Sequence, residues 1–328
     1  MVAYWRFSAI LVAAAVHAAS LVSGLPCTKH ELAEIPLPLP LPPIVSATWL
    51  ASNLNLESRN NNLAIIDIRP STQYAAGHVP SSINIPFQGT PFFSSNDENQ
   101  TLVFPPAEVV SQTLGLYGID LTTTQIVIVP DSAVLPSHMA MAARAATTFR
   151  YAGMLRGNIA ILDGGYPAWV SLSTTPSIST TTPSTRQPKD FVPSGKIDSS
   201  FIVDREYVRS RIGKVVSDGI ILLDARTEAD FKAGHIPSAL SLPAGEIWLS
   251  GGIWKDKNEL ERLFNKVVEE YKGKVGKNKG EVVVYCRTGM LATTWFYALS
   301  NVLGFQNVKL YDGSMEDWTR HGEVVSMG

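Results

Sequence analysis

One cysteine stands out as a residue that could do covalent chemistry. Cys286 follows the apolar run 281–285 (Glu-Val-Val-Val-Tyr) and precedes a short loop with Gly289, after which residues 291–303 have a helical pattern. At such a place, backbone N–H groups and the positive end of a helix dipole point at the sulfur. These surroundings stabilise the thiolate, the reactive form of cysteine. We therefore expect Cys286 to be a nucleophile, although many free cysteines are only small buried residues.

The other candidate ligands and cofactor motifs give no second site. Cys27 is the only other cysteine, so the chain has no disulfide framework, and we interpret Cys27 as unpaired. The six histidines are scattered, and no Cys/His group has the spacing of a metal site. No glycine-rich loop for nucleotide phosphates is present. We expect neither a metal nor another cofactor.

Length and composition fit a globular protein of about two domains. The chain has 328 residues, of which 45% are hydrophobic and 17% charged, and its formal net charge is −2. It has no basic stripe with interleaved aromatic residues, so we expect no nucleic-acid partner. We expect a monomer that acts on small molecules.

The N-terminus differs from the rest of the chain. Residues 7–24 are apolar and small after a single arginine, Arg6, which is typical of a secretory signal peptide over residues 1–24. An uncleaved membrane anchor and a mitochondrial presequence remain alternatives. Residues 25–43 form a proline-rich segment that we expect to be extended. In a secreted protein Asn99 would be a glycosylation acceptor.

The elements around Cys286 belong to a unit that occurs twice. Residues 66–86 and 223–243 align without a gap, with Asp-x-Arg followed by Ala-Gly-His-x-Pro-Ser in both copies. Residues 44–49 resemble 202–207, and residues 125–129 resemble 281–285. Asp-Gly followed by Trp recurs at 163–169 and 312–318. The chain is therefore a duplication of one domain of about 130 residues.

The two copies are expected at residues 44–172 and 197–328, joined by a Ser/Thr/Pro linker over 173–196. In the second copy, residues 220–224, 239–242, 281–285 and 308–311 have the pattern of buried strands. Residues 204–212, 258–271 and 291–303 have helical patterns between them. This alternation predicts an α/β fold with a mainly parallel sheet flanked by helices. Ligands of such sheets bind at the carboxyl ends of the strands, where Cys286 lies.

These motifs resemble the rhodanese superfamily, and in particular its tandem-domain sulfurtransferases. The resemblance rests on Asp-x-Arg and Gly-His-Ile/Val-Pro in both copies, Val-Tyr-Cys in the second, and Asp-Gly-x-x-x-x-Trp at the end of each. It implies two rhodanese-like domains, of which only the second is catalytic. The first copy has Asp131 where the second has Arg287, and it has no thiol there.

The resemblance also implies a mechanism and a set of site residues. A sulfur atom would pass from an anionic donor to Cys286 as a persulfide, and then to cyanide or a thiol. The loop after the cysteine would surround the sulfur with N–H groups, and Arg226 would bind the donor anion, unless it only pairs with Asp224 or Glu228. A tryptophan of the first domain, Trp49, would lie near the entrance, with a core position on the first helix as the equal alternative. The residues that the resemblance assigns to substrate binding are Arg226, Arg287, Thr288, Gly289, Met290, Leu291 and Trp49. The repeated histidines His78 and His235 are interpreted as architectural.

The loop composition bears on the donor. In this family Cys-Arg-Lys-Gly is typical of thiosulfate enzymes and Cys-Gly-Ser-Gly of 3-mercaptopyruvate enzymes. The chain has Arg287 and Thr288 at these positions, so it combines a thiosulfate-like cation with a mercaptopyruvate-like hydroxyl. Because an arginine suits a dianion, we favour thiosulfate, with 3-mercaptopyruvate as the alternative.

Two other classes of function fit the sequence less well. A cysteine phosphatase would need an arginine six residues after the cysteine, and Ala292 stands there. A non-catalytic rhodanese-like binding or sulfur-sensing protein would suit the first domain, but Cys286 with its arginine and glycine argues against it for the whole chain.

Overall fold

The computed structural model describes residues 39–60, 63–96, 100–120, 124–131, 136–172, 178–181, 197–214, 219–270 and 280–328. The expected signal peptide, Cys27, Asn99 and most of the expected linker lie outside these residues. Among the helices of the described part, none has the length and apolar character needed to cross a membrane.

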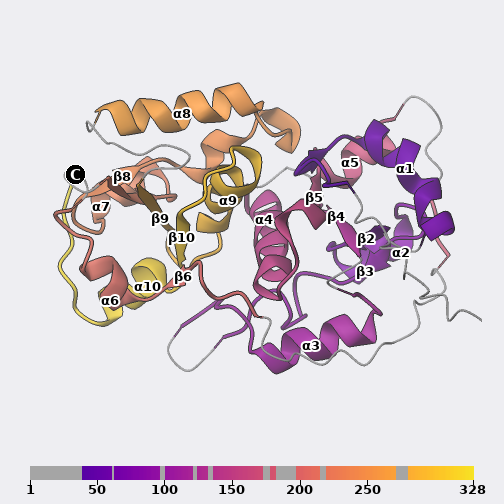
Figure 1. Ribbon diagram of the computed structural model, residues 1–328, viewed down its shortest axis with the longest axis horizontal. Helices are drawn as coiled ribbons and strands as arrows, with labels where there is room; N and C mark the ends of the chain where they lie inside the picture. The colour runs from indigo at the N-terminus through magenta and orange to yellow at the C-terminus, as the bar shows by residue number, and fades with distance from the viewer. Residues whose placement is uncertain are drawn as a thin grey trace, which may run out of the picture. The chain divides into compact units, whose positions relative to one another are not determined.

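The first half of the chain forms a sheet of five parallel strands (Figure 1). Its strand order is β1-β5-β4-β2-β3. The strands are β1 (Ile44–Val45), β2 (Leu63–Asp67), β3 (Ile83–Asn84), β4 (Gln125–Val129) and β5 (Ile159–Leu162). The helices are α1 (Ala47–Asn60), α2 (Ser71–Ala76), α3 (Ala107–Leu116), α4 (Pro136–Tyr151), η1 (Arg156–Asn158) and α5 (Gly165–Val170).

The second half repeats this topology with the order β6-β10-β9-β7-β8, again with parallel neighbours. The strands are β6 (Ile202–Val203), β7 (Ile220–Asp224), β8 (Ala239–Ser241), β9 (Glu281–Tyr285) and β10 (Val308–Tyr311). The helices are α6 (Arg205–Arg209), α7 (Glu228–Ala233), η2 (Ala244–Ile247), η3 (Ser250–Gly252), α8 (Lys257–Glu270), α9 (Ala292–Tyr297), the π-helical turn η4 (Ala298–Val302) and α10 (Ser314–Arg320).

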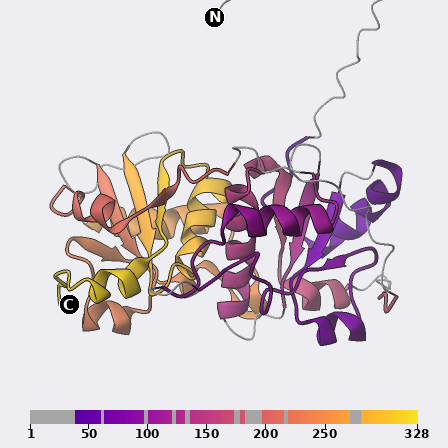
Figure 2. The same ribbon diagram turned by 90° about the horizontal axis from the view of Figure 1, so that it is seen from below.

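The predicted duplicated α/β fold is confirmed. Strands β7, β9 and β10 have the predicted bounds, and β8 ends one residue earlier than expected. The helix predicted over residues 291–303 is present as α9 followed by η4. The strands read as continuous apolar runs because helices cover both faces of each sheet (Figure 2).

Each sheet has one face that packs within its own half. In the first half this face packs on α1 and α5, and in the second half on α6 and α10. The opposite faces, with α3 and α4 in one half and α8 and α9 in the other, belong to a single hydrophobic cluster. Helix α4 packs against α9 within it. The two halves therefore share one continuous core.

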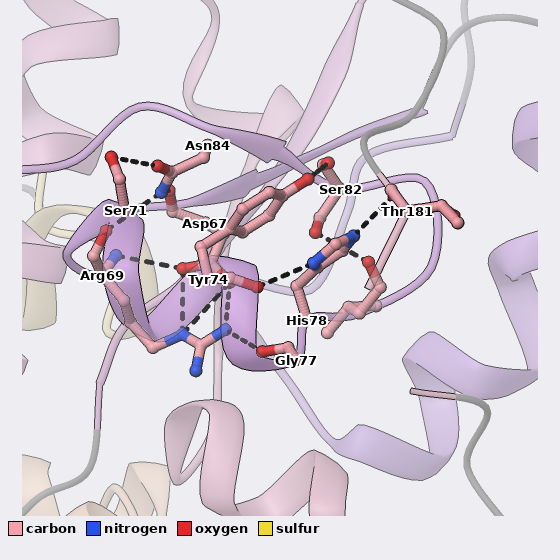
Figure 3. Close-up of polar contacts among 10 residues, drawn as sticks. Asp67, Arg69, Ser71, Tyr74, Gly77, His78, Ser82, Asn84 and Thr181 are labelled. Carbon is pink, nitrogen blue, oxygen red and sulfur yellow. Dashed lines mark hydrogen bonds and ion pairs between the residues drawn. The ribbon is translucent and has the colours of Figure 1, made fainter. Parts of the chain in front are cut away.

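The repeated Asp-x-Arg and Gly-His pairs form the same local network in both halves. In the first half, Arg69 donates to both carboxylate oxygens of Asp67 and to the carbonyl oxygen of Gly77 (Figure 3). His78 stacks on Tyr74, and its ring nitrogens lie 2.8 and 3.1 Å from the carbonyl oxygens of Tyr74 and Thr181. The network fixes the turn that follows α2 and anchors residues 178–181 of the expected linker.

His235 repeats this arrangement in the second half. It stacks on Phe231, and its Nδ1 lies 2.9 Å from the carbonyl oxygen of that residue. Its backbone pairs with Ser326, as the backbone of His78 pairs with Ser179. Both histidines thus hold a turn and the segment that follows each domain, which supports their architectural interpretation.

Candidate active site

Cys286 lies directly after the central strand β9, at the carboxyl edge of the second sheet. Its sulfur accepts hydrogen bonds from the backbone N–H groups of Thr288, Leu291 and Ala292. The expected ring of loop amides around the sulfur is therefore present. Such a ring stabilises negative charge on whatever sulfur species Cys286 carries.

Burial of Cys286 opposes the effect of these amides on the pKa of its thiol. Cys286 is 1% exposed. Burial raises the pKa of its thiol, the three N–H groups lower it, Asp224 raises it, and the net pKa lies above that of an ordinary thiol. The sequence-based expectation of a stabilised thiolate considered the amides and left out desolvation, which disfavours the charged form. The buried thiol consequently depends on its amides and on nearby cations for reactivity.

The start of α10 holds the Cys286 loop from one side. Ser314 Oγ accepts the backbone N–H of Cys286 at 3.0 Å, and the N–H of Met315 donates to the carbonyl of Cys286 at 3.1 Å. The N–H of Glu316 donates to the carbonyl of Arg287 at 2.9 Å. Ser314 has a φ of +53°, which is costly for a residue other than glycine. These bonds tie the loop backbone to the first turn of α10.

An open cavity of about 730 Å³ adjoins this loop. Arg287 and Leu291 of the loop line it, together with Arg226 at the end of β7 and Arg320 from α10. Three arginines against two carboxylates, Asp230 and Glu316, make it a site for anionic groups. The remaining lining residues are Ala233, Gly234, Met315, Thr319 and Val325.

The predicted substrate-binding residues of the Cys286 loop differ in their exposure and in their contacts. Arg287 is exposed and lines the cavity, whereas Thr288 contributes its backbone N–H to the sulfur. Gly289 is buried with a φ of +81°. Met290 and Leu291 are partly buried and pack on the shared core.

The structure shows one of the two interpretations of Arg226, the ion pair with Asp224, and donor binding stays a prediction. Its Nε and Nη2 donate to the Asp224 carboxylate, and Nη2 also donates to the Gly234 carbonyl at 2.7 Å. The residue also lines the cavity, and among the described residues we find no hydrogen bond to its Nη1. The ion pair with Asp224 therefore fixes a guanidinium whose outer edge faces the ligand space.

Trp49 belongs to the hydrophobic packing of the first half. Trp49 packs against the cluster of α1, α5 and the first sheet, and it does not line the cavity. Every lining residue that the structure describes belongs to the second half, so the described residues of the first half form no wall of this cavity. The first half reaches the cavity indirectly, because the N–H and hydroxyl of Thr101 both donate to Glu316 at 2.8 Å.

Comparison with known proteins decides the family. A model described as the rhodanese-like domain matches residues 46–172 and again residues 204–321. The chain belongs to the rhodanese family. The resemblance noted in the sequence is thereby confirmed over both halves.

Two curated relatives of this rhodanese match along most of its length. The chain is 26% identical over 305 residues to the thiosulfate sulfurtransferase of Corynebacterium glutamicum, which covers 87% of this chain and 89% of the relative. It is 27% identical over 296 residues to a putative thiosulfate sulfurtransferase of Synechococcus elongatus, with 87% and 85% covered.

Among solved structures, SseA from Escherichia coli is one that shares the fold. Its description concerns the catalytic mechanism of 3-mercaptopyruvate sulfotransferases. It superposes with a TM-score of 0.65 at 22% identity, over 83% of this chain and 98% of the other. At this identity the likeness shows the shared rhodanese architecture.

In the first rhodanese domain an aromatic ring covers Arg69, the counterpart of Arg226. Tyr166 takes the position of Met315, and the guanidinium of Arg69 lies 3.5 Å from the centre of its ring. A Cβ added at Gly77 would lie 2.9 Å from both Tyr166 and Ile178. Arg69 is 4% exposed there, against 12% for the Arg226 side chain. The first domain thus keeps the Asp-x-Arg network and lacks the thiol, and its Arg69 is more deeply buried than Arg226.

Proposed function

We propose that this rhodanese is a thiosulfate sulfurtransferase that carries sulfur on Cys286. The observation that carries the proposal is a cysteine sulfur inside three backbone N–H groups, beside a cavity lined by three arginines. The two relatives named thiosulfate sulfurtransferase support the same chemistry.

The reaction has two displacement steps. The Cys286 thiolate attacks the outer sulfur of thiosulfate, a new S–S bond forms, and the donor's S–S bond breaks as sulfite leaves with its electron pair. Cyanide or a thiolate then attacks the outer sulfur of the persulfide. The Cys286 thiolate leaves with the electron pair of the S–S bond, and thiocyanate or a new persulfide is released. Covalent catalysis of this kind replaces one difficult step with two easier ones.

The charges of the cavity suit the donor. The guanidinium of Arg287 is exposed at the cavity and has no ion pair within the described part of the chain. It is therefore available for the sulfonate oxygens of the donor, and a hydrogen bond to a charged group is worth about 1.5–3 kcal/mol. A dianion held there also brings its outer sulfur to the loop whose amides bind the cysteine.

3-Mercaptopyruvate is the second candidate donor, and the Thr288 hydroxyl is the observation that favours it. Thr288 lies half-buried in the loop next to the sulfur. A hydroxyl there can assist the proton transfer that a thiol donor requires. Side-by-side measurement of kcat/KM for the two donors separates the candidates, and we expect the higher value for thiosulfate.

The double variant Arg287→Gly/Thr288→Ser should shift the donor preference. Removal of the one unpaired cation of the loop takes away a charge-assisted contact to thiosulfate, whereas serine keeps the hydroxyl. We expect the ratio of thiosulfate to 3-mercaptopyruvate kcat/KM to fall by about tenfold or more. An unchanged ratio would place donor choice in Arg226 or Arg320 instead. Lys309→Ala, on the β10 surface, is the control that should leave the ratio unaltered.

We further propose that the protein enters the secretory pathway through residues 1–24. The basis is the sequence pattern alone, since this segment lies outside the described residues. N-terminal sequencing of protein recovered from the medium of expressing eukaryotic cells should show that the mature chain begins near Leu25. Retention of the full N-terminus in a membrane or organelle fraction would contradict the proposal.

A further inference from the structure

A buried arginine of the first domain binds a carboxylate of the catalytic domain. Arg144 of α4 is 0% exposed, and its Nη1 donates to Asp312 Oδ1 at 2.5 Å. Its Nε and Nη2 donate to the carbonyls of Phe93 and Leu102, at 3.2 and 2.7 Å. Its guanidinium lies 3.7 Å from the centre of the Phe104 ring. The arginine is thus fixed on all sides within the first domain and presents one nitrogen to Asp312.

The first domain holds the other carboxylate oxygen as well. The backbone N–H of Phe104 donates to Asp312 Oδ2 at 2.9 Å. Because both oxygens are bound in this way, the position of the Asp312 side chain is set from across the boundary between the domains.

Asp312 in turn touches the catalytic loop. A Cβ added at Gly289 would lie 2.4 Å from Asp312 Oδ1 and 2.5 Å from its carbonyl oxygen, so the two residues are in direct contact. Asp312 also begins the segment whose next residues, Ser314 and Met315, bind the backbone of Cys286. A continuous chain of contacts therefore runs from Arg144 through Asp312 to the loop that surrounds the sulfur.

The internal duplication provides a comparison for this contact. Asp163 holds the position of Asp312 in the first domain, and it accepts the backbone N–H of Trp254 from the second domain at 2.8 Å. In each domain, therefore, this aspartate accepts one backbone N–H from the other domain. Within the described residues, however, no cation pairs with Asp163, whereas Asp312 has Arg144. Buried ion pairs add little net stability, so an ion pair present only on the catalytic side calls for a role in that site.

We propose that Arg144 is a positioning residue for sulfur transfer, which acts from the non-catalytic domain through Asp312. It neutralises the carboxylate that lies against Gly289 and holds it there, so that the loop amides stay directed at the Cys286 sulfur. This inference rests on the proposed role of Cys286 as the sulfur carrier. It assigns to the first domain, none of whose described residues lines the cavity, a part in the chemistry of the second.

Removal of Arg144 changes the balance of charge around the cysteine. The charged groups around the Cys286 loop and its cavity are Asp224 and Arg226 at the end of β7, Asp230 on α7, Arg287 in the loop, and Asp312, Glu316 and Arg320 on or before α10. Without Arg144, Asp312 becomes an uncompensated buried carboxylate in contact with the loop. A nearby like charge disfavours the thiolate, so the thiol should ionise at higher pH.

The test is the pH dependence of Cys286 alkylation by iodoacetamide in the full-length protein, measured beside kcat and KM. For Arg144→Met we expect the midpoint to rise by about one pH unit, and kcat at neutral pH to fall by about tenfold with a smaller change in KM. In Arg144→Met/Asp312→Asn the uncompensated charge is gone, so the midpoint should return toward the wild-type value. Asp163→Ala removes the matching contact on the other side and should leave both quantities within about twofold.

The outcomes separate positioning from simple stability. A folded Arg144→Met variant with the wild-type midpoint and kcat would overturn the proposal, as would an equal effect of Asp163→Ala. If Arg144→Met does not fold, Arg144→Lys takes its place in the test. Lysine keeps the positive charge but lacks the guanidinium nitrogens that donate to the two carbonyls. A wild-type kcat in Arg144→Lys would then overturn the proposal, and a severalfold loss with an unchanged midpoint would support it. Alkylation needs no sulfur donor, so a failure of the proposed donor chemistry would not obscure the result.

Discussion

The variant Cys286→Ser is expected to lose sulfur transfer by at least about a thousandfold while it keeps its fold. The hydroxyl of serine is close in size to the thiol and can accept the same loop N–H groups. The Cys286 side chain takes no part in the hydrogen bonds that join the Cys286 backbone to Ser314 and Met315. The loss should therefore appear in kcat with thiosulfate and cyanide, and the thermal midpoint of unfolding should change little.

Cys27→Ser is the matched control, because Cys27 is the only other thiol of the chain. It should turn over at the wild-type rate. Substantial turnover by Cys286→Ser would show that sulfur does not pass through this residue and would remove the basis of the proposed mechanism.

The second large effect is expected for Gly289→Ala, with a fall in kcat/KM of about a hundredfold. The φ of +81° is unfavourable for alanine, by about 1–2 kcal/mol. The added Cβ would also meet the side chain and backbone of Asp312 at 2.4 and 2.5 Å, and Arg144 prevents the carboxylate from moving away. The loop must shift, and its amides then no longer converge on the sulfur.

Gly304→Ala isolates the effect of the close contact. Gly304 also has a positive φ, of +82°, but an added Cβ would meet nothing within 4 Å. We expect this control to lose some stability and to keep its activity. If Gly289→Ala kept wild-type kcat/KM, the loop would not need the tight approach of Asp312.

Much of the fold could be predicted because several sequence motifs occur in both copies of the duplicated domain. The Asp-x-Arg and Gly-His pairs recur because each half builds the same turn from them, around Asp67 in one and Asp224 in the other. The buried strands could be read from continuous β-branched runs, since parallel sheets are covered on both faces. The cysteine was evident because it ends such a run and opens a loop.

The groups that support the cysteine were not predicted, and the reason is physical. Arg144 and Asp312 are far apart in the sequence, and no local pattern shows that two such residues pair. The motif that contains Asp312 was used only as a repeat and as a mark of the family, although a repeated Asp-Gly at a strand end was a signal for contact with the adjoining loop. Arg320 was missed because it lies at the exposed C-terminal end of α10, where arginines are common.

Two further differences between the sequence-based expectations and the structure arise from desolvation and packing. The amides around Cys286 were expected correctly, but burial has the larger effect on its thiol. The family resemblance placed Trp49 near the entrance, with a core position as the equal alternative, and its side chain packs on the first-domain cluster. Burial depends on the assembled layers, so neither result could be obtained from residue spacing.

The most direct test of the account is mass spectrometry of the Cys286 peptide after the protein is mixed with thiosulfate and excess donor is removed. The account predicts that this peptide gains the mass of one sulfur atom, that added cyanide removes it with release of thiocyanate, and that Cys286→Ser gains nothing. A chain that turns over thiosulfate and cyanide while the Cys286 peptide stays unmodified at every stage would contradict it.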